Sequence, residues 1–167
     1  MGKIKFYILS LLFILTGNLC FAKQISFQIV QKFENVENKV RHEDLIESTY
    51  IFEDELLDAF FSKGFIVTNS PSVNIDKENP EKSVIKAGLK DAKEGLSDYY
   101  VHISVVYNDD NSLLLEKVEW SVYNGKNGKK IKSGDIKTSR QINLLIDRSF
   151  VDITSEITDK VLKVIKA

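Results

Sequence analysis

The sequence predicts a single α/β domain in which helices cover a mixed sheet of about five strands, in the order β-α-β-α-β-β-β-α. Three observations predict this class. In the first half of the chain, short apolar runs alternate with segments of helical spacing. Three consecutive strand patterns separated by turn residues follow, as in a meander. A final segment of helical spacing ends the chain, and no internal repeat or linker divides it.

The first β-α-β unit is predicted from residue 24 to residue 71. Ile25, Phe27 and Ile29 alternate with polar residues, which indicates a half-buried strand. Residues 34–41 are polar without an apolar period, so we expect a loop. Residues 43–63 carry an apolar stripe at helical spacing, and the glycine that follows them can cap a helix. The run FIVTNSP then predicts a strand, joined to the first by a right-handed crossover as its parallel neighbour.

The second helix is predicted to begin at Asn79-Pro80, with Asn79 as N-cap and Pro80 at the first helical position. The residues of its inner face recur at helical spacing: Val84, Gly88, Ala92 and Leu96. Because two of these residues are small, we expect this helix to lie close to the sheet. Glycine costs about 1 kcal/mol against alanine in a helix, so Gly88 indicates a packing requirement.

Three strands and a helix are predicted for the rest of the chain. Residues 99–107 alternate, so that Val101 and Ile103 share one face and His102 and Ser104 share the other. The turn sequence NDDN leads to a return strand over residues 113–123 and a further strand over residues 131–138. Residues 139–145 are ambiguous. The last helix follows from apolar residues spaced at three and four: Ile146, Phe150, Ile153, Ile157, Val161 and Val164.

The first 22 residues have the order of a secretory signal peptide. Lysines precede an apolar run over residues 6–15, and Cys20-Phe21-Ala22 follows polar residues, so we expect cleavage after Ala22. An uncleaved membrane anchor is one alternative, which the length of the run disfavours because it is about half of the ~20 residues that a spanning helix needs. An alternative is a lipid-anchored protein cleaved before Cys20, although Leu19 is larger than the residue that normally precedes a lipidated cysteine. Residues 23–167 form the predicted single globular domain, located in the periplasm or secreted.

Charge and cysteine content exclude several classes of protein. Cleavage after Ala22 would leave no cysteine, which excludes disulfides, thiolate metal sites and a cysteine nucleophile. Removing Lys3 and Lys5 from 23 basic residues leaves 21 against 24 acidic residues, a net charge of −3. A nucleic-acid-binding domain is usually basic, so we expect no nucleic-acid partner.

The stretch YNGKNGKKIKSG at residues 123–134 looks like a phosphate-binding loop but predicts a hairpin turn. Gly125 and Gly128 are three positions apart, whereas the phosphate loop G-x-x-x-x-G-K-S/T needs five and precedes a helix. Asn-Gly pairs are strong hairpin signals because both residues tolerate positive φ. The stretch and the predicted strand after it also gather lysines that protect a strand edge or contact an anionic partner: Lys126, Lys129, Lys130, Lys132 and Lys137.

No residue pattern predicts a catalytic, cofactor or metal site. His42 lies in HEDLI, which lacks the second histidine of HExxH, and His102 has no G-x-S-x-G nucleophile in the chain. We expect His102 to be a half-buried structural residue, with a small hydrolase or ligand-binding site around it as the alternative. Asp109 and Asp110 lack the remaining ligands of a calcium loop. Residues 53–55 are expected mostly on a solvated helix face, and Trp120 in the core.

Two segments resemble the TolB amino-terminal-like fold, a group that includes CsgG-like periplasmic domains and LpoB-like activators of penicillin-binding proteins. Residues 64–67 (GFIV) match the strand that follows the first helix in that group. Residues 122–134 match its strand, turn and glycine pattern, with Asn124 where aspartate is usual. The resemblance covers most of the chain after the signal peptide and rests on structural motifs. It implies a periplasmic domain of the cell envelope and assigns no functional residue.

These observations predict a non-enzymatic interaction or adaptor module of the cell envelope, without a cofactor. Its expected partner is an envelope protein or an anionic component of the wall or membrane, bound through the lysine-rich hairpin or an exposed sheet edge.

Overall fold

The structure is a computed structural model that describes residues 22–34, 39–76, 80–108, 114–141 and 148–165. The predicted signal peptide up to residue 21, with Cys20, lies outside these residues, as do Asp109 and Asp110. None of the described helices is long and apolar enough to cross a membrane.

Five strands and three helices follow one another in the predicted order, which confirms the fold class. The elements are β1 (Gln24–Glu34), α2 (Lys39–Ser62), β2 (Ile66–Asn74), α3 (Glu81–Glu94), β3 (Tyr99–Asn108), β4 (Leu114–Asn124), β5 (Lys130–Gln141) and α4 (Arg148–Ile165). The strands form one sheet in the order β2-β1-β3-β4-β5. Strand β1 is parallel to both β2 and β3, and the pairs β3–β4 and β4–β5 are antiparallel.

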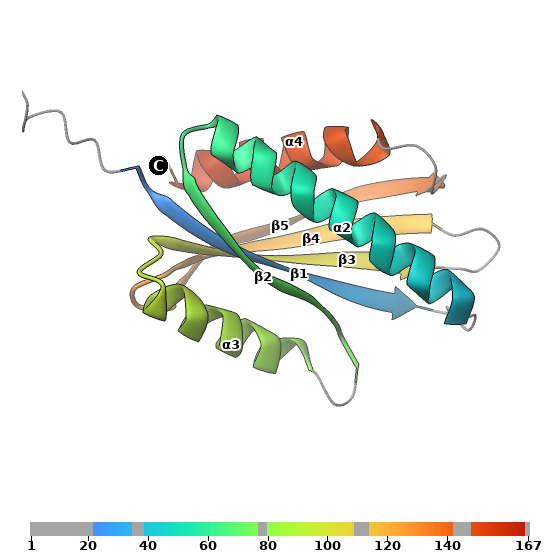
Figure 1. The fold of residues 1–167 in the computed structure, drawn as a ribbon, viewed down its shortest axis with the longest axis horizontal. Helices are drawn as coiled ribbons and strands as arrows, with labels where there is room; N and C mark the ends of the chain where they lie inside the picture. The colour runs from blue at the N-terminus through green and yellow to red at the C-terminus, as the bar shows by residue number, and fades with distance from the viewer. Residues whose placement is uncertain (1–21, 35–38, 77–79, 109–113, 142–147, 166–167) are drawn as a thin grey trace, which may run out of the picture.

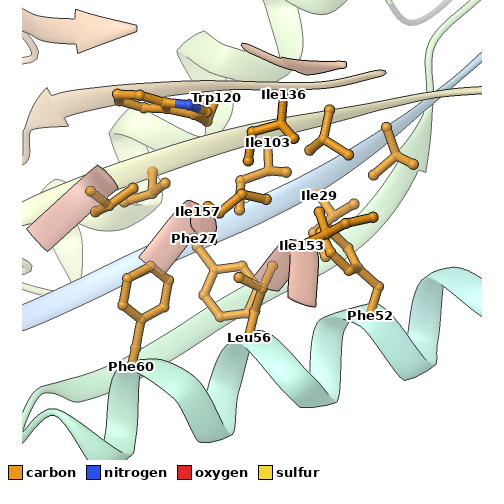
Figure 2. Packing of buried hydrophobic residues seen from close by; sticks show 14 of the residues in the cluster. Phe27, Ile29, Phe52, Leu56, Phe60, Ile103, Trp120, Ile136, Ile153 and Ile157 are labelled. Carbon is orange, nitrogen blue, oxygen red and sulfur yellow. The ribbon is translucent and has the colours of Figure 1, made fainter. Parts of the chain in front are cut away.

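The two faces of the sheet are covered unequally. Helices α2 and α4 lie on one face, and α3 alone lies on the other (Figure 1). The larger apolar core forms between the sheet, α2 and α4, where Phe52, Leu56 and Phe60 of α2 point toward the strands (Figure 2). Phe27 and Phe60 are both fully buried, with ring centroids 6.3 Å apart. The predicted core position of Trp120 is confirmed, since only 5% of its surface is exposed.

Helix α3 approaches the sheet closely, as its small inner residues predict. Val84, Gly88 and Ala92 are its buried residues. A side chain at Gly88 would overlap the ring of Tyr100, which is fully buried on β3 beneath the helix. Leu96 does not continue this face, because α3 ends at Glu94 and Leu96 is 81% exposed with φ +58°.

Several element boundaries differ from the prediction. Strand β1 extends to Glu34 and α2 begins at Lys39, so the predicted loop over residues 34–41 is wrong at both ends. Lysine, arginine and glutamate favour helix without an apolar period, which explains the longer helix. Helix α3 begins at Glu81 with Pro80 as its N-cap, one residue later than predicted. Strand β2 continues through Pro71, which an edge strand tolerates because one side of its backbone is unpaired.

Candidate functional site

A groove lies on the face of the sheet that carries α3. This helix packs against β1 and β3, so β4 and β5 form an open floor beside it. The groove has a volume of about 550 Å³, and its lining residues come from α3 and from the three strands β3, β4 and β5. Most of them are polar: Glu81, His102, Ser104, Lys117, Glu119, Ser121, Tyr123, Lys130, Ser133, Asp135 and Lys137.

One carboxylate joins the wall of the groove to its floor. Glu81, in the first turn of α3, accepts hydrogen bonds at Oε1 from Ser104 Oγ at 2.6 Å and from His102 Nε2 at 3.1 Å. Its Oε2 lies 3.0 Å from Lys32 Nζ on β1. The period of two residues in a strand places His102 and Ser104 on one face, where both side chains reach the helix start. The contacts therefore fix α3 to β1 and β3.

The protonation states in this cluster follow from its contacts. Burial alone would raise the pKa of Glu81, but hydrogen bonds from Ser104, Lys32 and His102 outweigh it and lower the pKa to about 2. Burial lowers the pKa of His102, although the bond to Glu81 opposes this effect. Glu81 is therefore ionised and His102 neutral at pH 7. A neutral His102 must carry its proton on Nε2 to donate to Glu81.

The other nitrogen of His102 belongs to a buried chain of polar groups. Tyr100 Oη lies 3.4 Å from His102 Nδ1 and donates to Gln28 Oε1 at 3.2 Å. Gln28 Nε2 in turn donates to the carbonyl of Pro71 at 3.1 Å. The chain of contacts runs from β3 through β1 to β2. These contacts connect three strands of the sheet beneath α3.

Lys32 connects this cluster to the groove floor. Its Nζ lies 2.9 Å from Glu119 Oε2, and Glu119 Oε1 lies 3.0 Å from Lys117 Nζ. Burial would lower the pKa of Lys32, but hydrogen bonds to Glu119 and Glu81 raise it overall. Burial would raise the pKa of Glu119, whereas bonds from Lys32 and Lys117 lower it. Both groups are therefore charged at neutral pH, and Glu119 is held in place from two sides.

The arrangement does not form a nucleophilic relay around His102. In such a relay, the carboxylate orients one ring nitrogen and the other takes the proton of the serine. Here Ser104 Oγ lies 3.4 Å from His102 Nε2 but donates its proton to Oε1 of Glu81 at 2.6 Å, and Nε2 donates to the same oxygen. The other ring nitrogen, Nδ1, faces Tyr100 Oη at 3.4 Å and not the serine. His102 is also only 3% exposed, so the prediction of a half-buried residue underestimated its burial. Among the described residues, no group of three or more His, Cys, Asp or Glu is placed to hold a metal ion.

The hairpin between β4 and β5 has the predicted turn. Asn124 Oδ1 accepts hydrogen bonds from the backbone N–H groups of Lys126 and Asn127, at 3.0 and 3.1 Å. Gly128 has φ +69°, a conformation that glycine adopts without strain. A phosphate-binding loop would open a helix at this point, whereas β5 follows the turn.

The five lysines predicted as a contact patch do not share one surface. Lys126 lies at the hairpin tip with its Nζ 3.2 Å from Asp98 Oδ1, and Lys129 is exposed beside it. Lys130 and Lys137 line the groove, and the Nζ of Lys130 lies 5.8 Å from the ring centroid of Tyr123. Lys132 pairs with Val122, which faces the large core, so Lys132 belongs to the opposite face. The strand alternation thus separates residues that are close in sequence.

A family model described as "Uncharacterised protein" matches residues 30–166. The chain belongs to that family. The matched range includes Glu81 and the three residues that contact its carboxylate, namely Lys32, His102 and Ser104. No curated protein matches the sequence.

Solved structures give matches at the level of the fold. The PelC dodecamer from Paraburkholderia phytofirmans is 10% identical, with a TM-score of 0.46, and the match covers 81% of this chain and 84% of that chain. The LpoB C-terminal domain from Salmonella enterica is 11% identical, with a TM-score of 0.38 and coverages of 76% and 90%. TolB from Acinetobacter baumannii is 10% identical, with a TM-score of 0.42 and coverages of 86% and 29%. LpoB and TolB are two of the groups that the sequence resembles.

Sequence reasoning identified His102 but missed the residues around it. Lys32, Glu81 and Glu119 lie on three different elements and carry no motif, so only the strand order brings them together. Glu53 was expected on a solvated face but is buried, and it accepts a hydrogen bond from Asn69. The alternation that placed His102 and Ser104 on one face was the available signal for the site.

Proposed function

We propose that this chain is an exported, non-enzymatic binding module of the cell envelope, and that it takes a charged partner in the groove beside α3. Export rests on the signal-peptide pattern of residues 1–22. The observation that supports the groove is a set of unpaired charges on its floor. Within the described residues, no ion pair includes Lys130, Asp135 or Lys137, and all three are exposed.

The groove combines these charges with a rigid support. Lys32 bridges Glu81 and Glu119 and so holds the helix against the floor, which places the wall before any partner arrives. Preorganised sites lose less conformational entropy on binding, which favours recognition. The lack of a relay at His102 argues for binding in place of hydrolysis.

Charge-reversal variants test whether the partner binds in the groove or at the hairpin tip. The tagged full-length protein is crosslinked in its host, captured and analysed by mass spectrometry. We compare the wild type with the groove variant Lys130→Glu/Lys137→Glu, the tip variant Lys126→Glu/Lys129→Glu, and Lys132→Glu on the opposite face as the control. We expect one dominant envelope partner, lost in the groove variant and retained in the control, with all variants folded.

Two outcomes would contradict this proposal. If the groove variant retains the partner and the tip variant loses it, binding occurs through the hairpin lysines and the groove plays no part. If no reproducible partner is captured from the wild type, the chain is no adaptor, and a screen for hydrolysis by the wild type and a Ser104→Ala variant would follow.

A further inference from the structure

Two neighbouring cross-strand pairs on the groove floor carry like charges. Lys117 lies directly opposite Lys137, and Glu119 lies directly opposite Asp135, in the antiparallel pair β4–β5. All four residues line the groove. Like charges directly opposite each other destabilise a sheet, whereas opposite charges stabilise it. On β4, Lys117 and Glu119 pair with each other, so within the described residues the charges that the sheet leaves without an ion pair in these rows are Asp135 and Lys137 on β5.

The same four side chains could form two favourable pairs. Exchanging Asp135 and Lys137 would place aspartate opposite Lys117 and lysine opposite Glu119. We call each pair of directly opposite residues a row. The basic row is Lys117 and Lys137, with two ammonium groups, and the neighbouring acidic row is Glu119 and Asp135, with two carboxylates. Local violations of such pairing rules are expected at functional sites, where a ligand supplies the missing interaction.

The spacing of the rows gives the geometry of a ligand. Opposite residues in a strand pair have Cβ atoms about 4.5–5.5 Å apart, so both side chains of a row can reach one group between them. Successive positions on one face of a strand are about 7 Å apart, because each residue rises about 3.3–3.4 Å. A matching ligand carries one ammonium and one carboxylate about 7 Å apart. An extended dipeptide has this length, since each residue spans at most about 3.3–3.6 Å.

The protein holds one member of the acidic row in place and leaves the other available. Glu119 is fixed by Lys32 at 2.9 Å and Lys117 at 3.0 Å. Asp135 and Lys137 on β5 are exposed and form no ion pair within the described residues. A ligand would thus meet a positioned carboxylate on β4 and adjustable side chains on β5.

We propose that the groove binds a zwitterionic dipeptide, with its ammonium between Glu119 and Asp135 and its carboxylate between Lys117 and Lys137. This proposal rests on the groove as the binding site of the proposed function and names the chemistry of its partner. A larger partner would present the same pair of groups on a short peptide segment.

The first test titrates the purified protein with the dipeptide Ala-Ala by calorimetry at low ionic strength. The probes that isolate each charge are N-acetyl-Ala-Ala, which lacks the ammonium, and Ala-Ala amide, which lacks the carboxylate. We expect saturable binding of Ala-Ala and roughly two- to fivefold weaker binding of each blocked form, the range expected for loss of partly exposed ion pairs. Equal binding of all three peptides, or no saturable binding of Ala-Ala, would overturn the proposal.

The second test exchanges the two charges on β5. The double variant Asp135→Lys/Lys137→Asp keeps the composition and the net charge but turns both like pairs into opposite pairs. We expect a higher melting temperature together with Ala-Ala binding weakened about tenfold or more. Lys132→Asp on the opposite face is the control and should leave binding unchanged. Undiminished binding in the exchanged variant would refute the assigned rows.

The failures of the two proposals can be told apart. If Ala-Ala does not bind but partner capture in the host still depends on Lys130 and Lys137, the groove is a binding site and the ligand class is wrong. If Ala-Ala binds as expected but the groove variant retains its envelope partner, the peptide site stands and the adaptor function through the groove is wrong.

Discussion

At the scale of single residues, Gly88 decides how closely α3 approaches the sheet. A Cβ atom at this position would lie 2.7 Å from Cε2 of the Tyr100 ring and overlap its hydroxyl group. We expect Gly88→Ala to lower the free energy of unfolding by about 1–3 kcal/mol through overpacking, although alanine favours the helix by about 1 kcal/mol. Urea denaturation followed by circular dichroism measures this change.

The neighbouring position provides the control for that substitution. Ala87 is exposed on the same helix, so Ala87→Gly changes helix propensity without changing the contact with Tyr100. We expect it to cost about 1 kcal/mol. If Gly88→Ala instead stabilised the protein, the close approach of α3 would not be a packing constraint.

The sequence indicates which face of an element a residue occupies. It does not indicate as readily which side chains of different elements contact each other. Alternation correctly placed His102 and Ser104 on one face of β3, because a strand has a strict period of two. It could not show that Glu81, more than twenty positions earlier, accepts from both side chains. Charged residues give no periodic apolar signal, and their pairing depends on the tertiary arrangement. For the same reason the lysines near the hairpin looked like one patch although the strand separates them.

At the scale of elements, Glu81 fastens the first turn of α3 to β1 and β3. The pKa of Glu81 in the folded protein is about 2, below its ordinary value of 4.5, so the ionised carboxylate stabilises the fold. This contribution is complete above pH 4.5 and is lost as the pH falls toward 2. We expect Glu81→Gln to lower the free energy of unfolding at pH 7 by about 1–3 kcal/mol, and the difference from wild type to shrink in acid.

Urea denaturation at pH 7, pH 4 and pH 2.5 tests the Glu81 prediction. The bond to Glu81 opposes the lowering of the His102 pKa by burial, so the difference between the two proteins reports on Glu81 together with its bond to His102. Glu94→Gln, near the other end of α3, is the matched control, because in the described part of the chain the ion pair of Glu94 is an exposed one with Lys90. A constant difference between Glu81→Gln and wild type over this pH range would contradict the assigned state of Glu81.

The boundaries of elements were the least predictable part of the fold. The apolar stripe predicted that α2 exists. Its start at Lys39 depends on residues that have high helix propensity but show no apolar periodicity, so the start was not predicted. Strand β2 passes through Pro71, which a local reading takes as a turn residue. Proline is acceptable there because β2 pairs only with β1, a fact of the sheet order that local sequence does not contain.

At the scale of the whole molecule, the two faces of the sheet differ in how much apolar core they carry. The order β-α-β-α-β-β-β-α was predicted because each element has its own period. The position of β1 between β2 and β3 also depends on the second crossover, through α3, whose neighbour in the sheet the sequence does not indicate. Helices α2 and α4 share the large core with the sheet (Figure 2). Of the described helices, α3 is the one on the other face (Figure 1). Two of its three buried residues are glycine and alanine.

This asymmetry predicts that α3 opens before the rest of the domain. Its buried apolar area is small, so a local opening costs less free energy than separating α2 and α4 from the core. We expect the amides of α3 to exchange with deuterium on the order of ten- to a hundredfold faster than those of β1 and β3. Glu81→Gln should accelerate α3 further and leave the central turns of α2 unchanged, because Glu81 ties only α3 to the strands. Equal exchange rates in α3 and β3 would mean that the helix opens only with the whole fold, and that its polar contacts outweigh its small core.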